Sequence, residues 1–207
     1  MNTTIIYLIR HSIYLKDTGI LNVDDNDQVK NEKIILSIEG EIKANELSQM
    51  EELQNIDVLW SSNYVRAKQT AKYIAARNDI EINIDSRFGE RKLGDLKTLG
   101  DLGNIKKHSY TIEQLLDSEL KNKDGESRHE VNIRMKSAIN DILNNDKGKR
   151  IAIVSHGMAI KSYLMDYCTL NDEFKLTYNN NIIETNSPGI IKLTFTSNSL
   201  IDIEQII

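Results

Sequence analysis

The run Thr3-Thr4-Ile5-Ile6-Tyr7-Leu8-Ile9 leads directly into Arg10-His11-Ser12 near the start of the chain. β-Branched and aromatic residues dominate the first part of this stretch, which predicts a buried strand. A guanidinium and an imidazole then stand side by side where the strand ends. In an open α/β sheet, ligands bind at the carboxyl ends of the strands. The stretch therefore predicts a buried strand of an α/β sheet and part of a ligand-binding edge.

A second strand of the same kind lies far downstream. The apolar run Ile151-Ala152-Ile153-Val154-Ser155 leads into His156-Gly157. Two strands thus each deliver a histidine at their carboxyl end. If both belong to one sheet, the two imidazoles are expected to converge at the same edge.

Helical and strand patterns alternate over the rest of the chain. Strands are predicted at 56–61 and 81–84, helices at 37–54, 62–77, 127–148 and 158–167, and two further strands at 190–195 and 200–206. Ser197-Asn198-Ser199 between the last two strands suits a hairpin turn. This order predicts an α/β fold, a three-layer α/β/α domain with a mostly parallel sheet and an antiparallel C-terminal hairpin.

Two polar segments interrupt the pattern within what we expect to be one domain, residues 1–207. Residues 16–33 are predicted to form a solvated loop, and their acidic run lacks the glycine and glutamate spacing of an EF-hand. Residues 95–125 are poor in apolar side chains and too short to hold a core of their own. They are predicted to be an insertion over the active site, with a short helix near 112–120.

Composition limits the possible partners. The chain has 207 residues and a net charge of −5 without a basic stripe, which argues against a nucleic-acid partner. No stretch is long enough to cross a bilayer and no signal peptide is recognisable, so no membrane partner is expected. The single cysteine, Cys168, excludes an internal disulfide framework and fits a cytoplasmic protein. The oligomeric state is not indicated.

Five residues on separate segments could meet at the sheet edge: Arg10, His11, Arg66, Glu90 and His156. Two guanidiniums match the oxygens of a phosphate group. A histidine beside them can attack phosphorus, and a carboxylic acid can protonate the leaving oxygen and then activate water. No metal or other cofactor is needed, since the cationic side chains can neutralise the transferring group. Each residue alone could equally be structural; their joint placement favours chemistry.

Six ordered motifs carry a resemblance to a known family. They are Arg10-His11; Leu36-Ser37-Ile38-Glu39-Gly40 with Ala44; Ser61-Ser62 with Arg66-Ala67 and Gln69-Thr70-Ala71; Glu90-Arg91 before Leu93-Gly94; Gly125-Glu126-Ser127 with Glu130-Val131 and Arg134; and Val154-Ser155-His156-Gly157. Together they resemble the histidine phosphatase superfamily, the phosphoglycerate-mutase-like proteins, over most of the chain.

The resemblance implies a role for each matching residue. His11 would be the nucleophile that becomes phosphorylated, and Glu90 the general acid and then the base. Arg10, Arg66 and His156 would complete the phosphate pocket, and Gly157 would let the backbone approach the oxygens. The implied partner is a small phosphorylated substrate, and the implied chemistry is independent of metal.

The sequence departs from the family pattern in three places. Ser12 replaces the glycine of the family's Arg-His-Gly triplet, and its side chain could narrow the pocket mouth or restrict the backbone beside the substrate. Ile13-Tyr14-Leu15 is apolar where the family often carries polar substrate contacts. Asp95-Leu96-Lys97 lacks the family's aromatic-acid-glycine turn. These departures bear on the identity of the substrate.

Three functions follow from these observations. A phosphomonoester hydrolase is favoured over a phosphoglycerate mutase, because family mutases tend to have a tail beyond the last strand and this chain stops at Ile206-Ile207. A mutase would also need a lid that excludes water. A non-catalytic phosphate- or phosphoprotein-binding module is the third possibility, suggested by Ser12. Lys106, Lys107 and His108 could meet a second anionic group or form a solvated basic turn.

Overall fold

A six-stranded sheet forms the centre of the molecule. The computed structural model describes residues 3–16, 25–94 and 112–207. The strand order is β3-β2-β4-β1-β8-β9, with bounds β1 Thr3–Arg10, β2 Val58–Ser61, β3 Ile82–Ile84, β4 Arg150–Ser155, β8 Gly189–Thr196 and β9 Ser199–Gln205. The first four strands in this order are parallel, β8 pairs antiparallel with β1, and β9 pairs antiparallel with β8. The predicted mostly parallel sheet with an antiparallel C-terminal hairpin is confirmed.

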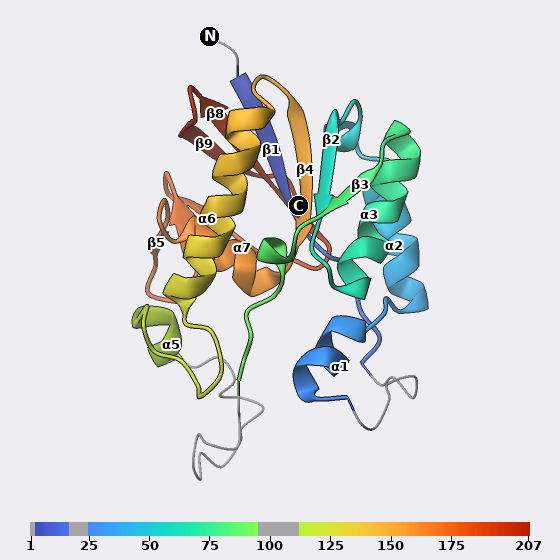
Figure 1. The fold of residues 1–207 in the computed structure, drawn as a ribbon. Helices are drawn as coiled ribbons and strands as arrows, with labels where there is room; N and C mark the ends of the chain where they lie inside the picture. The colour runs from blue at the N-terminus through green and yellow to red at the C-terminus, as the bar shows by residue number, and fades with distance from the viewer. Residues whose placement is uncertain (1–2, 17–24, 95–111) are drawn as a thin grey trace.

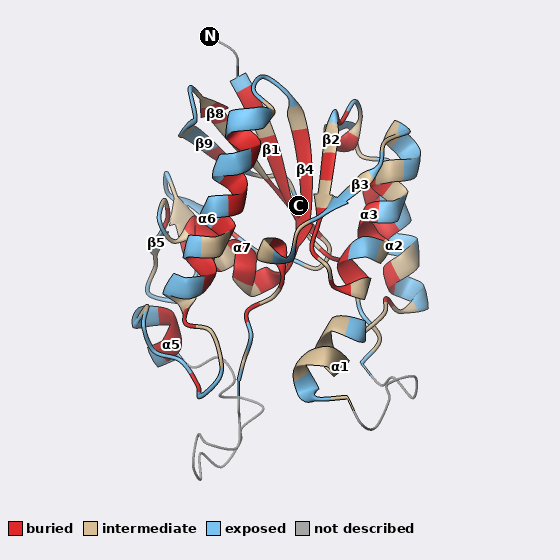
Figure 2. Ribbon diagram, viewed as in Figure 1, coloured by how far each residue is buried: buried red, intermediate tan, exposed pale blue. Residues whose placement is uncertain are grey.

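Helices cover both faces of this sheet (Figure 1). One face carries α2 (Ile38–Ser48) and α3 (Val65–Asn78), and the other carries α6 (Arg128–Asn145) and α7 (Gly157–Leu164). Burial follows the same division, since each helix is buried on the side that meets the sheet and exposed on the other (Figure 2). The predicted three-layer α/β/α arrangement is confirmed.

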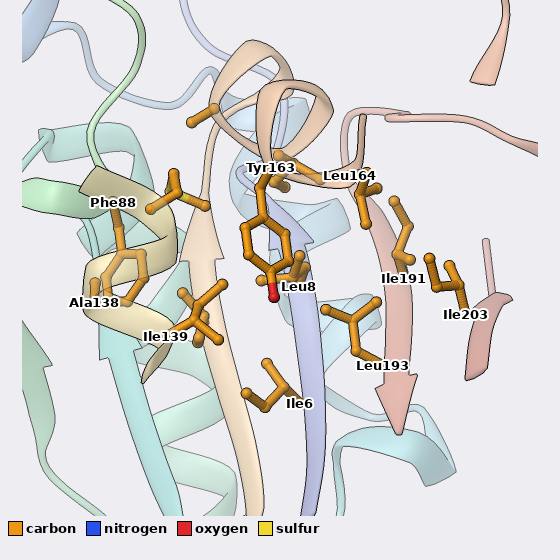
Figure 3. Packing of buried hydrophobic residues seen from close by; sticks show 14 of the residues in the cluster. Ile6, Leu8, Phe88, Ala138, Ile139, Tyr163, Leu164, Ile191, Leu193 and Ile203 are labelled. Carbon is orange, nitrogen blue, oxygen red and sulfur yellow. The ribbon is translucent and has the colours of Figure 1, made fainter. Parts of the chain in front are cut away.

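The alternation of side chains along β1 explains why both faces need a helical layer. Ile6 and Leu8 pack with α6 and α7, whereas Tyr7 and Ile9 pack with α2 and α3. Figure 3 shows the first cluster, with the Tyr163 ring of α7 set over Leu8. A strand that is apolar on both faces reads as a continuous hydrophobic run, which is the pattern that opens this sequence.

Capping residues set the starts of the long helices. Ser37 accepts from the Gly40 N–H at the start of α2, and Ser127 with Glu130 forms a capping box at the start of α6. The end of α2 was predicted too late: the helix stops at Ser48, and a 3-10 turn, η1 (Glu51–Leu53), follows. α3 begins at Val65 rather than after Ser62, because the Ser62 hydroxyl is engaged in the site described below.

Part of the predicted loop at 16–33 is helical, so that prediction is wrong for α1 (Asp27–Lys33). The Asn26 side chain accepts from the Val29 N–H, and Lys30 and Lys33 lie in the last turn. No residue of α1 is buried, so no apolar periodicity marks it in the sequence. Residues 17–24 lie outside the described part of the chain.

A small antiparallel sheet that the sequence did not predict follows α7. Its strands are β5 (Thr169–Leu170), β6 (Leu176–Tyr178) and β7 (Asn181–Ile183). Strands of two or three residues are too short to show an alternating pattern. The predicted helix at 158–167 ends early, at Leu164, and Cys168 is buried in the segment between α7 and β5.

The predicted insertion at 95–125 is described only in its second part. That part contains α5 (Ile112–Leu116), and residues 95–111 lie outside the described residues, together with Lys106, Lys107 and His108. An insertion over the active site therefore stays a prediction. Among the described residues, no helix combines the length and the apolar character needed to cross a membrane.

Candidate active site

The two predicted histidines meet at the carboxyl edge of the sheet. β1 and β4 are parallel neighbours with Arg10 opposite Ser155, so His11 and His156 leave the sheet side by side. The His11 N–H donates to the Ser155 carbonyl at 3.0 Å, and the two imidazole centroids are 5.0 Å apart. The predicted convergence of the two strand ends is confirmed.

The His11 ring is held in one orientation. Its Nδ1 lies 2.7 Å from the Ser12 carbonyl, which can only accept, so Nδ1 carries the hydrogen. Its Nε2 therefore has a lone pair, and it accepts from Arg66 Nε at 3.0 Å. Burial, followed by the charge of Arg66, lowers the pKa of His11 to about 3. The imidazole is neutral at physiological pH and presents Nε2 as its nucleophilic atom.

Donors without acceptors surround this ring. Arg10 donates one N–H to the Thr185 carbonyl at 2.6 Å, but its Nε is buried and has no partner among the described residues. His156 Nδ1 is likewise buried and unpartnered there. Gly157 makes room for the Arg10 guanidinium, because a Cβ at this position would lie 3.1 Å from Arg10 Nε. Buried polar atoms without partners are rare, and here they form an incomplete shell that suits an anion.

Ser62 forms a hydrogen bond with His156, the second histidine of the site. The Ser62 hydroxyl accepts from the Tyr64 N–H at 3.1 Å and lies 2.8 Å from His156 Nε2. Burial, followed by the charges of His11 and Arg66, lowers the pKa of His156 well below its usual range, so its ring is neutral. We assign the hydroxyl hydrogen to the bond with Nε2, which places the ring hydrogen on Nδ1. In this tautomer the buried Nδ1 of His156 is an N–H donor.

Replacing Ser62 by alanine should lower kcat/KM for phosphate esters by about 10- to 100-fold, because the His156 tautomer is no longer fixed. The matched control is Ser61→Ala, since Ser61 is equally buried but its hydroxyl bonds the Ser62 carbonyl. Both variants should lose about 1 kcal/mol of stability. Kinetics and ¹⁵N shifts of the His156 ring check this; equal activity losses in both variants would contradict a tautomer role for Ser62.

Glu90 lies on the loop after η2 (Ser86–Phe88), which Arg134 of α6 holds in place. The Arg134 guanidinium donates to the carbonyls of Arg87, Gly89 and Glu90 at 2.6, 2.9 and 3.2 Å and forms an ion pair with Glu126. The Glu90 carboxylate accepts from the backbone N–H of Ala159 at 3.1 Å, at the start of α7. The acid/base candidate is therefore fixed against the helix that follows His156.

His11, both arginines and Glu90 share one cleft of about 390 Å³. Its lining residues are Arg10, His11, Tyr14, Asn31, Ile34, Arg66, Glu90, Arg91, Leu93 and Met158. Arg66 is only 4% exposed, and it also donates to the Asn31 carbonyl of α1 at 2.5 Å. Four of the five predicted chemical residues thus line one cavity, and His156 lies directly behind His11.

Ser12, expected near the substrate, lies behind the nucleophile instead of in the lining. It is fully buried, its N–H donates to the Thr70 hydroxyl at 3.0 Å, and its carbonyl accepts from His11. Its backbone lies outside the left-handed region, so serine fits here without the freedom of glycine. The Ser12 side chain does not narrow the cleft.

The free energy of unfolding should decrease as the pH is lowered, because both histidines are buried in their neutral form. Between pH 6.5 and about 3 the unfolded chain binds a proton at residue 11 that the folded chain does not, so stability decreases as pH falls below 6.5. At pH 5 this amounts to about 2 kcal/mol for His11. Urea unfolding gives the free energy of unfolding at pH 7.5 and at pH 5.0. Between these two values it should fall by about 2 kcal/mol less in His11→Asn than in wild type. Equal losses in both proteins would contradict the buried neutral imidazole.

Comparison with known proteins agrees with this geometry. The sequence model of the histidine phosphatase superfamily (branch 1) matches residues 6–186, a range that contains Arg10, His11, Arg66, Glu90 and His156. The chain belongs to the histidine phosphatase superfamily. The neutral His11 ring, with Nδ1–H bound to the Ser12 carbonyl and Nε2 beside Arg66, lies within the matched range.

Curated relatives of this histidine phosphatase superfamily member include mutase-like proteins. It is 26% identical over 157 residues to the probable phosphoglycerate mutase GpmB of Yersinia enterocolitica, covering 75% of this chain and 70% of that protein. It is 32% identical over 114 residues to the phosphoglycerate mutase-like protein 4 of Arabidopsis thaliana, covering 53% of this chain and 49% of that one.

Solved structures show the same fold at low identity. A mycobacterial glucosyl-3-phosphoglycerate phosphatase superposes with a TM-score of 0.69 at 16% identity, covering 98% of this chain and 97% of that one. Bacillus stearothermophilus YhfR superposes with a TM-score of 0.67 at 19% identity, covering 95% and 94%. These likenesses establish the superfamily's architecture for this chain, and the reaction has to be argued from the site.

Some residues of the site escaped the sequence reasoning. Ser62 was predicted only as the first residue of a helix and part of a motif, and Arg134 had no role beyond its place in a motif. Ser187, whose hydroxyl donates to the His11 carbonyl at 2.8 Å, and Thr185 lie on the segment before β8, far along the chain from His11. Only the doubled Ser61-Ser62 pair before Arg66 carried a usable signal. The others act through backbone contacts that no residue pattern reveals.

Proposed function

We propose that this protein is a phosphomonoester hydrolase that acts through a phosphohistidine on His11. The observation that carries the proposal is the fixed tautomer of His11: Nδ1–H bonds the Ser12 carbonyl, so Nε2 holds the lone pair in the cleft beside Arg66. Glu90 lines the same cleft and supplies a proton-transfer group. Nucleophile, oxyanion donors and acid/base group are thus assembled in one cavity.

In the first step Nε2 of His11 attacks phosphorus. The N–P bond forms as the bond to the leaving oxygen breaks, and the Glu90 carboxyl gives its proton to that oxygen. Arg10 Nε, the Arg66 guanidinium and His156 Nδ1–H stabilise the charge on the transferring phosphoryl oxygens. The alcohol departs, and residue 11 carries the phosphoryl group.

In the second step water takes the place of the alcohol. The Glu90 carboxylate accepts a proton from water as its oxygen bonds to phosphorus, and the N–P bond breaks. Inorganic phosphate leaves, and the lone pair returns to Nε2. The Glu90 carboxylate accepts from the Ala159 N–H at the start of α7, so this acid/base group is held at the helix that follows His156.

A phosphoglycerate mutase is the second candidate, since the curated relatives include probable members of that activity. A non-catalytic phosphate- or phosphoprotein-binding module is the third. Incubation with p-nitrophenyl phosphate and with 3-phosphoglycerate separates all three. We expect phosphate release that depends on His11. Interconversion to 2-phosphoglycerate with little phosphate release would favour the mutase, and background rates in both wild type and His11→Ala would favour the binding module.

A further inference from the structure

We propose that the preferred substrate carries a single anionic group, the phosphate, on an uncharged and largely apolar leaving group. This inference rests on the proposed function, because the leaving group must occupy the part of the cleft that the phosphate does not. It names a substrate class, which the superfamily membership leaves open.

The outer wall of the cleft is apolar. Tyr14, Ile34, Leu93 and Met158 come from four separate segments and line the cavity together with His11. The Tyr14 ring is 38% exposed, and its centroid lies 6.0 Å from that of His11. An aromatic ring so close to the nucleophile is placed to contact the atoms attached to the ester oxygen. The apolar Ile13-Tyr14-Leu15 stretch of the sequence thereby acquires a role.

Among the described lining residues, the phosphate chemistry uses three of the four charged side chains, Arg10, Arg66 and Glu90. Arg10 and Arg66 surround His11, and Glu90 is the acid/base group. Arg91 is only 1% exposed and sits within the wall, where it donates to the Gln114 side chain at 2.7 Å. A carboxylate or second phosphate on the leaving group would have to leave water and lie against the apolar side chains of the cleft. Burying a charge in this way is unfavourable.

The cavity that adjoins the cleft also disfavours a second anion on the substrate. It has a volume of about 580 Å³ and shares Asn31 and Leu93 with the cleft. Its remaining lining residues are Asn26, Asp27, Gln28, Lys92, Gly94 and Asp124. Two carboxylates, two further amides and one lysine suit hydroxyl or amine donors and repel a second anion. A leaving group long enough to pass the apolar side chains of the cleft would meet Asp27 and Asp124 in this cavity, which disfavours a second anion on it.

The test is a series of alkyl phosphates whose alcohols are similar leaving groups, so that binding rather than leaving-group reactivity varies. We expect kcat/KM to rise roughly fourfold for each methylene that the apolar side chains of the cleft bury, from ethyl to butyl to hexyl phosphate. Hexyl and 2-phenylethyl phosphate should exceed glycerol 3-phosphate and 3-phosphoglycerate by at least tenfold. Leu93→Asn should flatten this slope, whereas the matched control Leu120→Asn, at an exposed leucine outside the cleft, should keep it.

Binding measured without turnover separates this inference from the proposed function. Calorimetry with ethylphosphonate, hexylphosphonate and 3-phosphonopropionate should give the tightest Kd for hexylphosphonate, whether or not any ester is hydrolysed. Absence of hydrolysis for every ester would overturn the hydrolase alone. A flat slope, or preference for 3-phosphoglycerate and 3-phosphonopropionate that is lost in Arg91→Met, would overturn the apolar substrate class and place a second anion site at Arg91.

Discussion

Replacing His11 by asparagine should lower kcat/KM for every phosphate monoester by on the order of 10⁴-fold or more, because the covalent route is lost. Among the described residues, His156 is the nearest other imidazole, but its Nε2 is bound to Ser62 and its Nδ1 is assigned the hydrogen. Initial rates of phosphate release, measured with p-nitrophenyl phosphate and with an alkyl phosphate, give the value.

The control experiments for His11→Asn test whether the variant still folds and still binds inorganic phosphate. Asparagine can still donate to the Ser12 carbonyl, so the β1 end should keep its conformation, and the buried site loses an imidazole that destabilises the fold at low pH. Thermal unfolding at pH 7.5 should match wild type within about 1 kcal/mol, and inorganic phosphate should still bind. A residual rate within tenfold of wild type would remove His11 from the mechanism.

Replacing Glu90 by glutamine should lower kcat/KM for an alkyl phosphate by about 10²- to 10⁴-fold, because the leaving alkoxide needs a proton that an amide cannot give. The amide oxygen of glutamine can still accept from the Ala159 N–H, so the loop should stay in place. With p-nitrophenyl phosphate the leaving group needs little protonation. Phosphorylation of His11 should then survive, while hydrolysis of the phosphohistidine slows.

This difference between substrates makes the Glu90 prediction specific. Rapid mixing of Glu90→Gln with p-nitrophenyl phosphate should give a burst of p-nitrophenol followed by a slow phase, since water attack now lacks its base. Glu126→Gln is a useful comparison, because Glu126 forms an ion pair with Arg134, whose guanidinium holds the Glu90 loop. Equal rate losses for alkyl and aryl esters, without a burst, would contradict the acid/base assignment.

The architecture was readable from the sequence wherever an element is buried on a regular period. Residues 5–9 of β1 and 151–154 of β4 are continuous apolar runs because both faces of the sheet are covered, and the capping box at Ser127 marks the start of α6. Prediction failed where burial is absent or the element is short. α1 buries no residue, and β5 to β7 have two or three residues each, so neither has a period to detect.

The site divides in the same way. His11 and His156 follow strong strand signals, so their meeting could be predicted from sheet topology alone. Arg66 and Glu90 depended on motifs, because nothing in their local pattern fixes their direction. The supporting contacts could not be predicted: the Ser12 carbonyl, the Thr185 carbonyl and the loop carbonyls bound by Arg134 are backbone atoms, which every residue type possesses. The residue types in the sequence therefore do not reveal these contacts.

The central claim concerns one atom, Nε2 of His11, and trapping the phosphoenzyme tests it directly. Wild type or Glu90→Gln is mixed with substrate, quenched under alkaline conditions that preserve phosphohistidine, and mapped by tandem mass spectrometry with NMR to identify the isomer. The account predicts a phosphoryl group on Nε2 of His11, because Nδ1–H is bound to the Ser12 carbonyl. Phosphorylation at Nδ1 of His11, at His156, or at no residue during turnover would contradict it.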